Sequence, residues 1–140
     1  MQSVSQFRLN GLRALYLLIA IGFGTFLLPG ILFPSRPSTP TESVIDFMLL
    51  AFWLLTLLGV RYPLQMLPVL LWEIIWKTIW VAAILIPQWS SGNMDKFTEA
   101  NISWIPLLFL CYCAIPWRYV VMQYVIKPSE PWRQASKSKE

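Results

Sequence analysis

Long apolar runs separated by short polar stretches are the dominant pattern of this chain. Four such runs occur, and each is close to the roughly 20 residues that an α-helix needs to cross the hydrocarbon core of a bilayer. The stretches between them contain Pro, Ser, Thr, Asn and Gly, which favour turns and loops. The pattern therefore predicts an all-α, integral membrane four-helix bundle. The predicted spans cover about residues 12–33, 44–61, 66–87 and 102–122.

The predicted domain organisation is one membrane domain over residues 1–126, followed by a disordered polar cytoplasmic tail over residues 127–140. The tail is rich in Pro, Ser and Lys, a composition that does not favour a packed core. The first apolar run is too long for the apolar region of a signal peptide, and no A-x-A-like cleavage site follows it. We expect this run to be a retained span. The basic, acid-free start leaves an organellar presequence open as an alternative.

Local signals refine the predicted helix ends. Pro29 predicts a kink or an early end of the first helix. Ser43, followed three residues later by Asp46, resembles a capping box that would open the second helix. Pro116 should bend the fourth helix and free the backbone carbonyl of Tyr112, one turn earlier.

Histidine is absent from the chain, and this excludes several kinds of site. A bis-histidine haem, a zinc or di-iron site with histidine ligands and a Ser–His–Asp triad cannot be built within it. Cys111 and Cys113 are two residues apart, so on a helix they project about 200° from each other and would neither bridge nor close a metal site. No cofactor, metal site or catalytic constellation is therefore expected.

Composition and charge indicate a membrane protein with a defined orientation. Hydrophobic residues make up 56% of the chain and charged residues 13%. The net charge of +4 does not indicate nucleic-acid binding, because the basic residues lie at helix ends instead of in one stripe. Eight basic residues fall on one side of the predicted topology and two on the other, a bias that places the first side, with both termini, in the cytoplasm. The eight are Arg8, Arg13, Arg61, Arg118, Lys127, Arg133, Lys137 and Lys139, and the two are Arg36 and Lys96.

The third apolar run carries two full charges, Glu73 and Lys77, in its interior. Each charge costs roughly 2.5–3.5 kcal/mol near the bilayer centre on insertion scales, so we expect both to be partnered away from lipid. They lie one helical turn apart with the glutamate nearer the N-terminus, which is the favourable order for an ion pair. Arg118 or Arg61, at the cytoplasmic ends of their helices, is expected to join them in an intramembrane polar network.

Three tryptophans, Trp72, Trp76 and Trp80, form a stripe along the same predicted helix at intervals of four residues. One interpretation is bulky packing between helices. The other is an aromatic pocket for a flat or cationic ligand beside Glu73, since tryptophan normally prefers the membrane interfaces to mid-depth. Trp80 is also placed for a cation–π contact with Lys77.

Three short runs carry a resemblance to a known family: RYPLQMLP at 61–68, WEIIWKTIW at 72–80 and IPWRY at 115–119. In these runs the chain resembles an uncharacterised family of small bacterial inner-membrane proteins. The resemblance implies a four-helix architecture in the bacterial inner membrane and directs attention to the charged residues of these runs. It implies no activity.

The functional prediction follows from the buried charges. A paired Glu–Lys can fix the rotation of a helix or form a polar seam to a partner subunit, which favours an accessory or scaffolding component of a membrane assembly. The alternative is a small homodimeric proton-coupled transporter in which Glu73 is the titrating acid. A membrane enzyme acting on lipids is a third interpretation, with Glu73 as a lone base. The expected partners are the lipid bilayer and another membrane protein or a second copy of this chain, and no nucleic acid.

Overall fold

The computed structural model describes residues 4–130, and within that range the chain is helix or loop throughout. Four helical stretches are long and apolar enough to cross a membrane, which confirms the all-α architecture predicted from the sequence. They run over Gln6–Leu32, Pro40–Arg61, Leu67–Ser91 and Lys96–Ala114. Residues 131–140 of the predicted tail lie outside the described range, together with the basic residues Arg133, Lys137 and Lys139.

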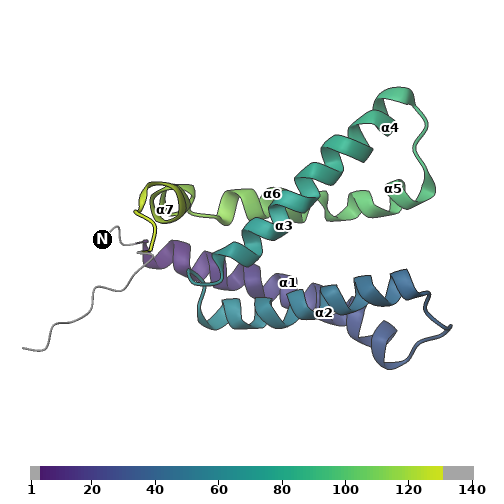
Figure 1. Ribbon diagram of the computed structural model, residues 1–140, viewed down its shortest axis with the longest axis horizontal. Coiled ribbons are helices and arrows are strands. Elements are labelled where there is room, and N and C mark those ends of the chain that lie inside the picture. The colour runs from purple at the N-terminus through teal and green to yellow at the C-terminus, as the bar shows by residue number, and fades with distance from the viewer. Residues whose placement is uncertain (1–3, 131–140) are drawn as a thin grey trace, which may run out of the picture.

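Figure 1 labels the helices along these stretches, which also contain short π-helical and 3-10 segments (η). The first two stretches are α1 (Gln6–Leu32) and α2 (Pro40–Arg61). The third comprises α3 (Leu67–Trp80), η1 (Val81–Leu85) and α4 (Ile86–Ser91). The fourth comprises α5 (Lys96–Asn101), η2 (Ile102–Trp104) and α6 (Ile105–Ala114). A last helical segment follows as α7 (Trp117–Val120) and η3 (Val121–Ile126).

The capping box that opens α2 is formed by Thr39 and Glu42, not by the predicted pair Ser43 and Asp46. The Glu42 N–H donates to the Thr39 hydroxyl at 3.2 Å, and the Glu42 carboxylate accepts from the Thr39 N–H at 2.9 Å. Both pairs have the required spacing. In the earlier pair, however, Thr39 is followed directly by Pro40, and proline is favoured in the first turn of a helix. The predicted start of the second span is therefore late by about one turn.

α1 and α2 pack closely because small residues face large ones. Gly59 of α2 lies against the ring of Tyr16 of α1, where an added methyl group would overlap the ring. The Tyr16 hydroxyl donates to the carbonyl of Pro63 at 3.2 Å, and the Trp53 indole donates to the carbonyl of Ala20 at 2.8 Å. This combination of a small residue and interhelical hydrogen bonds is typical of helix packing in membranes.

Two prolines lie within helices that continue past them. α1 runs past Pro29, and the third stretch runs past Pro87 until Gly92, whose φ of 70° ends it. Because Pro87 has no N–H, the helix just before it shifts to π-type bonding. The Ile86 N–H donates to the carbonyl of Val81, five residues earlier. The early end considered for the first helix is therefore not seen, and the third helical stretch continues to Ser91, past the predicted end of the span at residue 87.

Pro116, in contrast, ends α6 outright. Ile115 has an extended backbone (φ −67°, ψ 127°), and α7 begins anew at Trp117. The carbonyl of Tyr112, which this proline was predicted to free, accepts a hydrogen bond from the Trp117 indole at 2.8 Å. The helical stretch that contains the predicted fourth span (102–122) therefore starts earlier, at Lys96, and stops before the proline, at Ala114.

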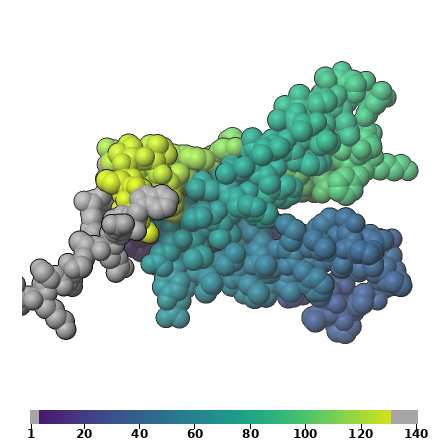
Figure 2. All heavy atoms as spheres, in the orientation of Figure 1, coloured from purple at the N-terminus to yellow at the C-terminus, as the bar shows by residue number. Residues whose placement is uncertain are grey.

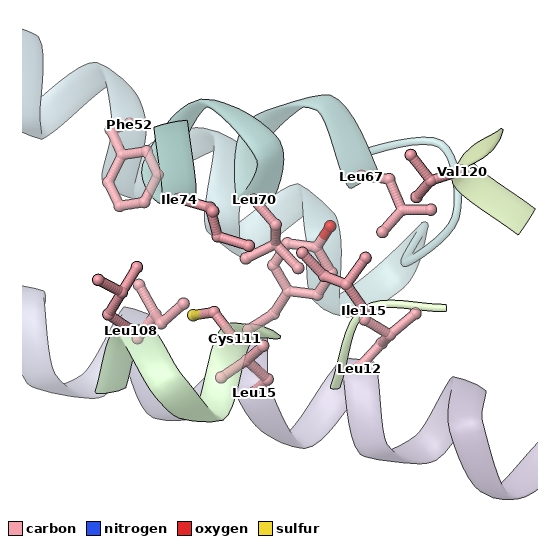
Figure 3. Close-up of a cluster of buried hydrophobic side chains, with 12 residues drawn as sticks. Leu12, Leu15, Phe52, Leu67, Leu70, Ile74, Leu108, Cys111, Ile115 and Val120 are labelled. Atoms are coloured by element: carbon pink, nitrogen blue, oxygen red, sulfur yellow. The ribbon is translucent and has the colours of Figure 1, made fainter. Parts of the chain in front are cut away.

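The helices converge at one end of the molecule and diverge at the other (Figure 1). At the converged end, which carries α7 and the start of α1, buried side chains from all four stretches form one core (Figure 3). At the splayed end, which carries the loops 33–39 and 92–95, the third and fourth stretches swing away from α1 and α2 and leave an open notch (Figure 2). The core residues are Leu12, Leu15, Tyr16, Ile19, Phe52, Leu67, Leu70, Ile74, Leu108, Cys111, Ile115 and Val120.

Candidate functional site

Glu73 and Lys77 form an ion pair in the interior of the molecule. The two residues are only 1% and 2% exposed. They share the inward face of α3 with Leu70 and Ile74, because positions three and four residues apart lie on one side of a helix. The structure thus brings this pair together as its spacing predicts, and covers it with protein.

Three aromatic rings surround the ammonium of Lys77. Its Nζ lies 4.9 Å from the ring centre of Trp104, 5.5 Å from that of Trp76 and 5.8 Å from that of Phe23. Rings within about 6 Å attract a cation electrostatically, and more strongly where water is excluded. The rings come from η2, α3 and α1, so this aromatic cage joins the first stretch to the third and fourth.

The carboxylate of Glu73 has a partner on each oxygen. Oε1 faces the ammonium of Lys77, and Oε2 accepts a hydrogen bond from the Trp76 indole at 2.8 Å. A buried ion pair is tolerated only when such additional bonds offset the loss of hydration. Within residues 4–130, no second ion pair involves either residue. The pair is therefore closed on itself.

The predicted tryptophan stripe belongs to a continuous row of aromatic rings. Trp72 contacts Trp76 and Phe52, while Trp104 contacts Trp76 and Trp80, with ring centres 5.2 to 6.2 Å apart. These are ordinary distances for tilted aromatic pairs. The tryptophans of the predicted aromatic pocket therefore pack in a row with Phe52 and Trp104. The row runs in the order Phe23, Phe52, Trp72, Trp76, Trp104, Trp80.

Neither arginine predicted to join the polar network reaches it. Arg61 is exposed and lies over the ring of Tyr62, 5.4 Å from its centre. Arg118 is exposed on α7, beyond the break at Pro116. The prediction assumed that the fourth span continues through residue 118. Because this span stops before the proline, the network reduces to the ion pair and its aromatic cage.

Phe23, Phe52 and Trp104 are the site residues that sequence reasoning missed. Trp104 replaces Trp80 as the strongest candidate for a cation–π contact with Lys77, since its ring centre is the nearest of the three. No local pattern reveals these partners, because each approaches the third stretch from a helix that is distant in sequence. Only the packing of the stretches brings them together.

Among residues 4–130, no group of three His, Cys, Asp or Glu side chains is arranged to hold a metal ion. Cys111 is buried in the core and Cys113 is exposed. Two shallow surface hollows lie in the loop regions instead, one beside Arg36 and the other beside Gly92.

No protein-family model, curated protein or solved structure matches the chain. The chemistry of the site must therefore be argued from its geometry. That geometry offers two opposite charges that face each other, with the second carboxylate oxygen bonded to the Trp76 indole. Its clearest consequence is mechanical: it holds the first, third and fourth stretches together at one level.

Proposed function

We propose that this protein is an accessory or scaffolding component of a membrane assembly in the bacterial inner membrane, with both termini on the cytoplasmic side. One observation carries the proposal. The closed ion pair and its aromatic cage lie partway along the third stretch, which runs from the converged end to the splayed end, at the level where α1, α3 and η2 meet. The site is thus a rigid junction that sets how far the helices open.

The junction acts across the bundle because its parts come from separate stretches. Phe23 of α1 and Trp104 of η2 both lie on the ammonium of Lys77 in α3. Phe52 of α2 contacts Trp72 of α3 at the same level, with ring centres 5.4 Å apart. Removing one of these contacts would loosen the angle between the first two stretches and the last two.

Beyond the junction, the helices present apolar surface without a helical neighbour. α4 has no buried side chain, and large apolar residues on α2 and α5, such as Phe47 and Phe97, are exposed. In a membrane, helices associate through packing of such faces against a complementary surface. The open notch between the first two and the last two stretches is a shape that suits the binding of a partner protein.

The charge distribution supports the proposed orientation. Arg8, Arg13, Arg61, Arg118 and Lys127 belong to the converged end, while the splayed end carries only Arg36 and Lys96 among the basic residues described. Positive charge gathers on the cytoplasmic side of inner-membrane proteins. The splayed end would then open toward the outer face of the membrane.

The transport alternative fits the geometry less well. A proton-coupled acid must release its counter-ion and meet water or substrate during each cycle. Glu73 is instead held by Lys77 on one oxygen and by Trp76 on the other. Both contacts, and the aromatic cage, would have to open for Glu73 to exchange a proton.

Photo-crosslinking in living cells tests the proposal. The photoreactive amino acid p-benzoylphenylalanine replaces Phe47 or Phe97 at the splayed end and, as a matched control, the exposed Phe109 of α6, which follows the core residue Leu108. All three positions are exposed phenylalanines, so the substitutions should not disturb the fold. After mild detergent extraction, mass spectrometry identifies what each position has captured.

The proposal expects one stoichiometric foreign membrane protein at Phe47 or Phe97 and none at Phe109. Lipid adducts alone at all three positions would contradict it. A homodimer adduct, together with pH-dependent ligand binding that Glu73→Gln abolishes, would contradict it as well and support transport. Turnover of a lipid by the purified chain would support the enzyme interpretation instead.

A further inference from the structure

The segment after Pro116 is a helix that does not follow the direction of the others. α7 and η3 form ten continuous residues, Trp117–Ile126, and Figure 1 shows this helix end-on while α1 and α6 are seen from the side. The segment therefore crosses the converged end at a steep angle to α1 and α6. If those helices span a bilayer, it runs along the bilayer surface.

The corner that produces this direction is held by specific contacts. The Trp117 indole donates to the carbonyl of Tyr112 at 2.8 Å, and the two rings stack with centres 5.8 Å apart and planes 26° apart. The Tyr112 hydroxyl in turn lies 2.6 Å from that of Thr78 on α3. The corner is therefore tied to both α6 and α3 and does not depend on the proline alone.

The inward side of the segment is anchored in the core. Val120 is buried and lies close to Leu67 at the start of α3 (Figure 3). Tyr119 and Gln123, which neighbour Val120 on the helix surface, are half-buried. The segment thus has one face fixed against the core, and its opposite face points outward.

That opposite face is apolar. Val121 and Met122 are exposed, Val125 is 75% exposed and Ile126 is 60% exposed. A helix that packs on a water-soluble protein shows the reverse arrangement, with apolar residues inward and polar ones outward. An outward apolar face on a helix parallel to a membrane surface is the arrangement of interfacial helices.

Positive charge flanks this face, and Glu130, beyond Lys127, is the one acid described near it. Arg118 and Lys127 are exposed at its two ends, and Arg61 ends α2 at the same end of the molecule. The described acidic residues of the two loop regions, such as Glu42 and Asp95, lie at the opposite end. Cations beside an apolar interfacial helix are attracted to anionic phospholipid headgroups.

We infer that Trp117–Ile126 is an interfacial helix that binds the anionic phospholipid surface of the membrane, through its apolar outer face and its flanking cations. The helix would lie just below the headgroups, where Arg118 and Lys127 meet the phosphates and Val121 and Val125 meet the start of the acyl chains. This inference goes beyond the scaffolding role and does not depend on it.

Depth measurement by electron paramagnetic resonance tests the inference on the full chain in lipid nanodiscs. Cys111 and Cys113 are replaced by alanine, and single nitroxide labels are placed at Val121→Cys and Val125→Cys. Collision rates with oxygen, which enters lipid, and with a water-soluble nickel chelate report the depth of each label. Leu54→Cys and Leu58→Cys, both exposed on α2, give the reference for a spanning helix.

The inference expects the labels at Val121 and Val125 to lie at equal depth, about 5–10 Å into the boundary between headgroups and acyl chains. The two labels on α2 should differ in depth by about 6 Å, since a spanning helix advances 1.5 Å per residue. A steady change of depth from 121 to 125 would overturn the inference. So would free access of the nickel chelate to both labels, or exclusion of both reagents, which would mean that a protein covers this face.

The charge requirement is tested by changing the lipid. Phosphatidylglycerol, added to phosphatidylcholine in equal amount, should reduce the mobile, water-exposed population of the label at Val125. Arg118→Gln and Lys127→Gln should each weaken this effect about fivefold. The matched changes Arg36→Gln and Lys96→Gln, at the splayed end, should leave it unaltered. Equal populations in both lipids would overturn the anionic-lipid part of the inference.

Discussion

The converged end and the splayed end of this molecule belong to the same four apolar stretches but are held together by different means. At the converged end, Gly59 admits the ring of Tyr16, and leucine and isoleucine side chains fill the space between all four stretches. At the splayed end, α4 buries no side chain at all. Between the two lies the Glu73–Lys77 pair, covered by aromatic rings.

This difference teaches that apolar composition alone does not close a membrane bundle. Lipid is as apolar as leucine, so helices stay together only where close packing or polar contacts favour it. The converged end has both, through its small residues and its hydrogen bonds. At the splayed end the polar contacts lie within each pair of helical stretches, Arg36 with Glu42 in one and Gln88 with Asp95 in the other, and the two pairs separate (Figure 1).

The largest expected effect comes from breaking the ion pair that divides the two ends. Glu73→Gln leaves the ammonium of Lys77 buried without a counter-charge, and Lys77→Met leaves the carboxylate with only Trp76 as a partner. Each change should lower the free energy of unfolding by about 3–5 kcal/mol. Unfolding in detergent micelles, titrated with sodium dodecyl sulfate, measures it.

The double variant sharpens this test. Because Glu73→Gln together with Lys77→Met removes both buried charges, it should be more stable than either single variant by about 2 kcal/mol. Lys96→Gln, a change of charge on the surface, serves as a control and should stay within about 0.5 kcal/mol of the wild type. Single effects that simply add in the double variant would mean that the two residues do not stabilise each other.

The next largest effect should come from opening the converged end. In Gly59→Ala, the new methyl group would overlap the ring of Tyr16, and α1 and α2 would have to move apart. Overpacking of this kind costs about 1–3 kcal/mol. Gly22→Ala is the matched control, because nothing lies within 4 Å of its added carbon. Equal melting temperatures for the two variants would show that the close approach is not needed.

Trp104 tests the border between the two ends. Its ring contacts Lys77, Trp76 and Trp80, so Trp104→Leu would remove one wall of the aromatic cage. We expect a loss of about 2 kcal/mol from the cation–π and aromatic contacts together. Trp89→Leu, at an exposed position of α4, should change stability by less than about 0.5 kcal/mol. A larger effect at Trp89 than at Trp104 would mean that the stabilising contacts lie at the splayed end and not in the aromatic cage.

The fold was predictable from the sequence as far as local patterns determine it. Four long apolar runs predict four helices, and the spacing of Glu73 and Lys77 predicts their pairing. The helix ends were less predictable, because proline has more than one outcome: the helix tolerates Pro87 by a π-type shift, whereas Pro116 ends it. Whether a carbonyl freed by proline finds a new partner, as that of Tyr112 does, depends on tertiary packing.

The site was predictable only for the part that one helix contributes. Trp76, Glu73 and Lys77 all lie on α3, and the helical repeat of 3.6 residues predicts that they are neighbours. Phe23 and Trp104 reach Lys77 from other stretches, and their approach depends on how α1 and η2 lie against α3. The same limit explains why Arg118 was expected at the pair: its position follows from the break at Pro116, which turns the chain away.

The smallest expected effect is local to the loop of the splayed end, where Asp95 caps α5. Its carboxylate accepts from the Thr98 N–H at 2.6 Å and from the Gln88 side chain at 3.0 Å. These hydrogen bonds, that from the Thr98 backbone foremost, hold the pKa of Asp95 below its usual range. A carboxyl group with a lowered pKa in the folded state stabilises the fold above its unfolded pKa, and this contribution is lost as the pH falls through the lowered value.

Amide hydrogen exchange at Thr98 and Glu99, corrected for the intrinsic rate, should therefore become faster as the pH falls below roughly 3.9, the ordinary value for aspartate. The change should be no more than a few-fold, since the carboxylate is exposed and solvent screens its interactions. Asp95→Asn keeps a good capping residue but cannot titrate, so it should keep the protection and lose the pH dependence. If exchange in Asp95→Asn accelerated over the same range, another group would control the end of α5, and the splayed end would depend on acid for a different reason.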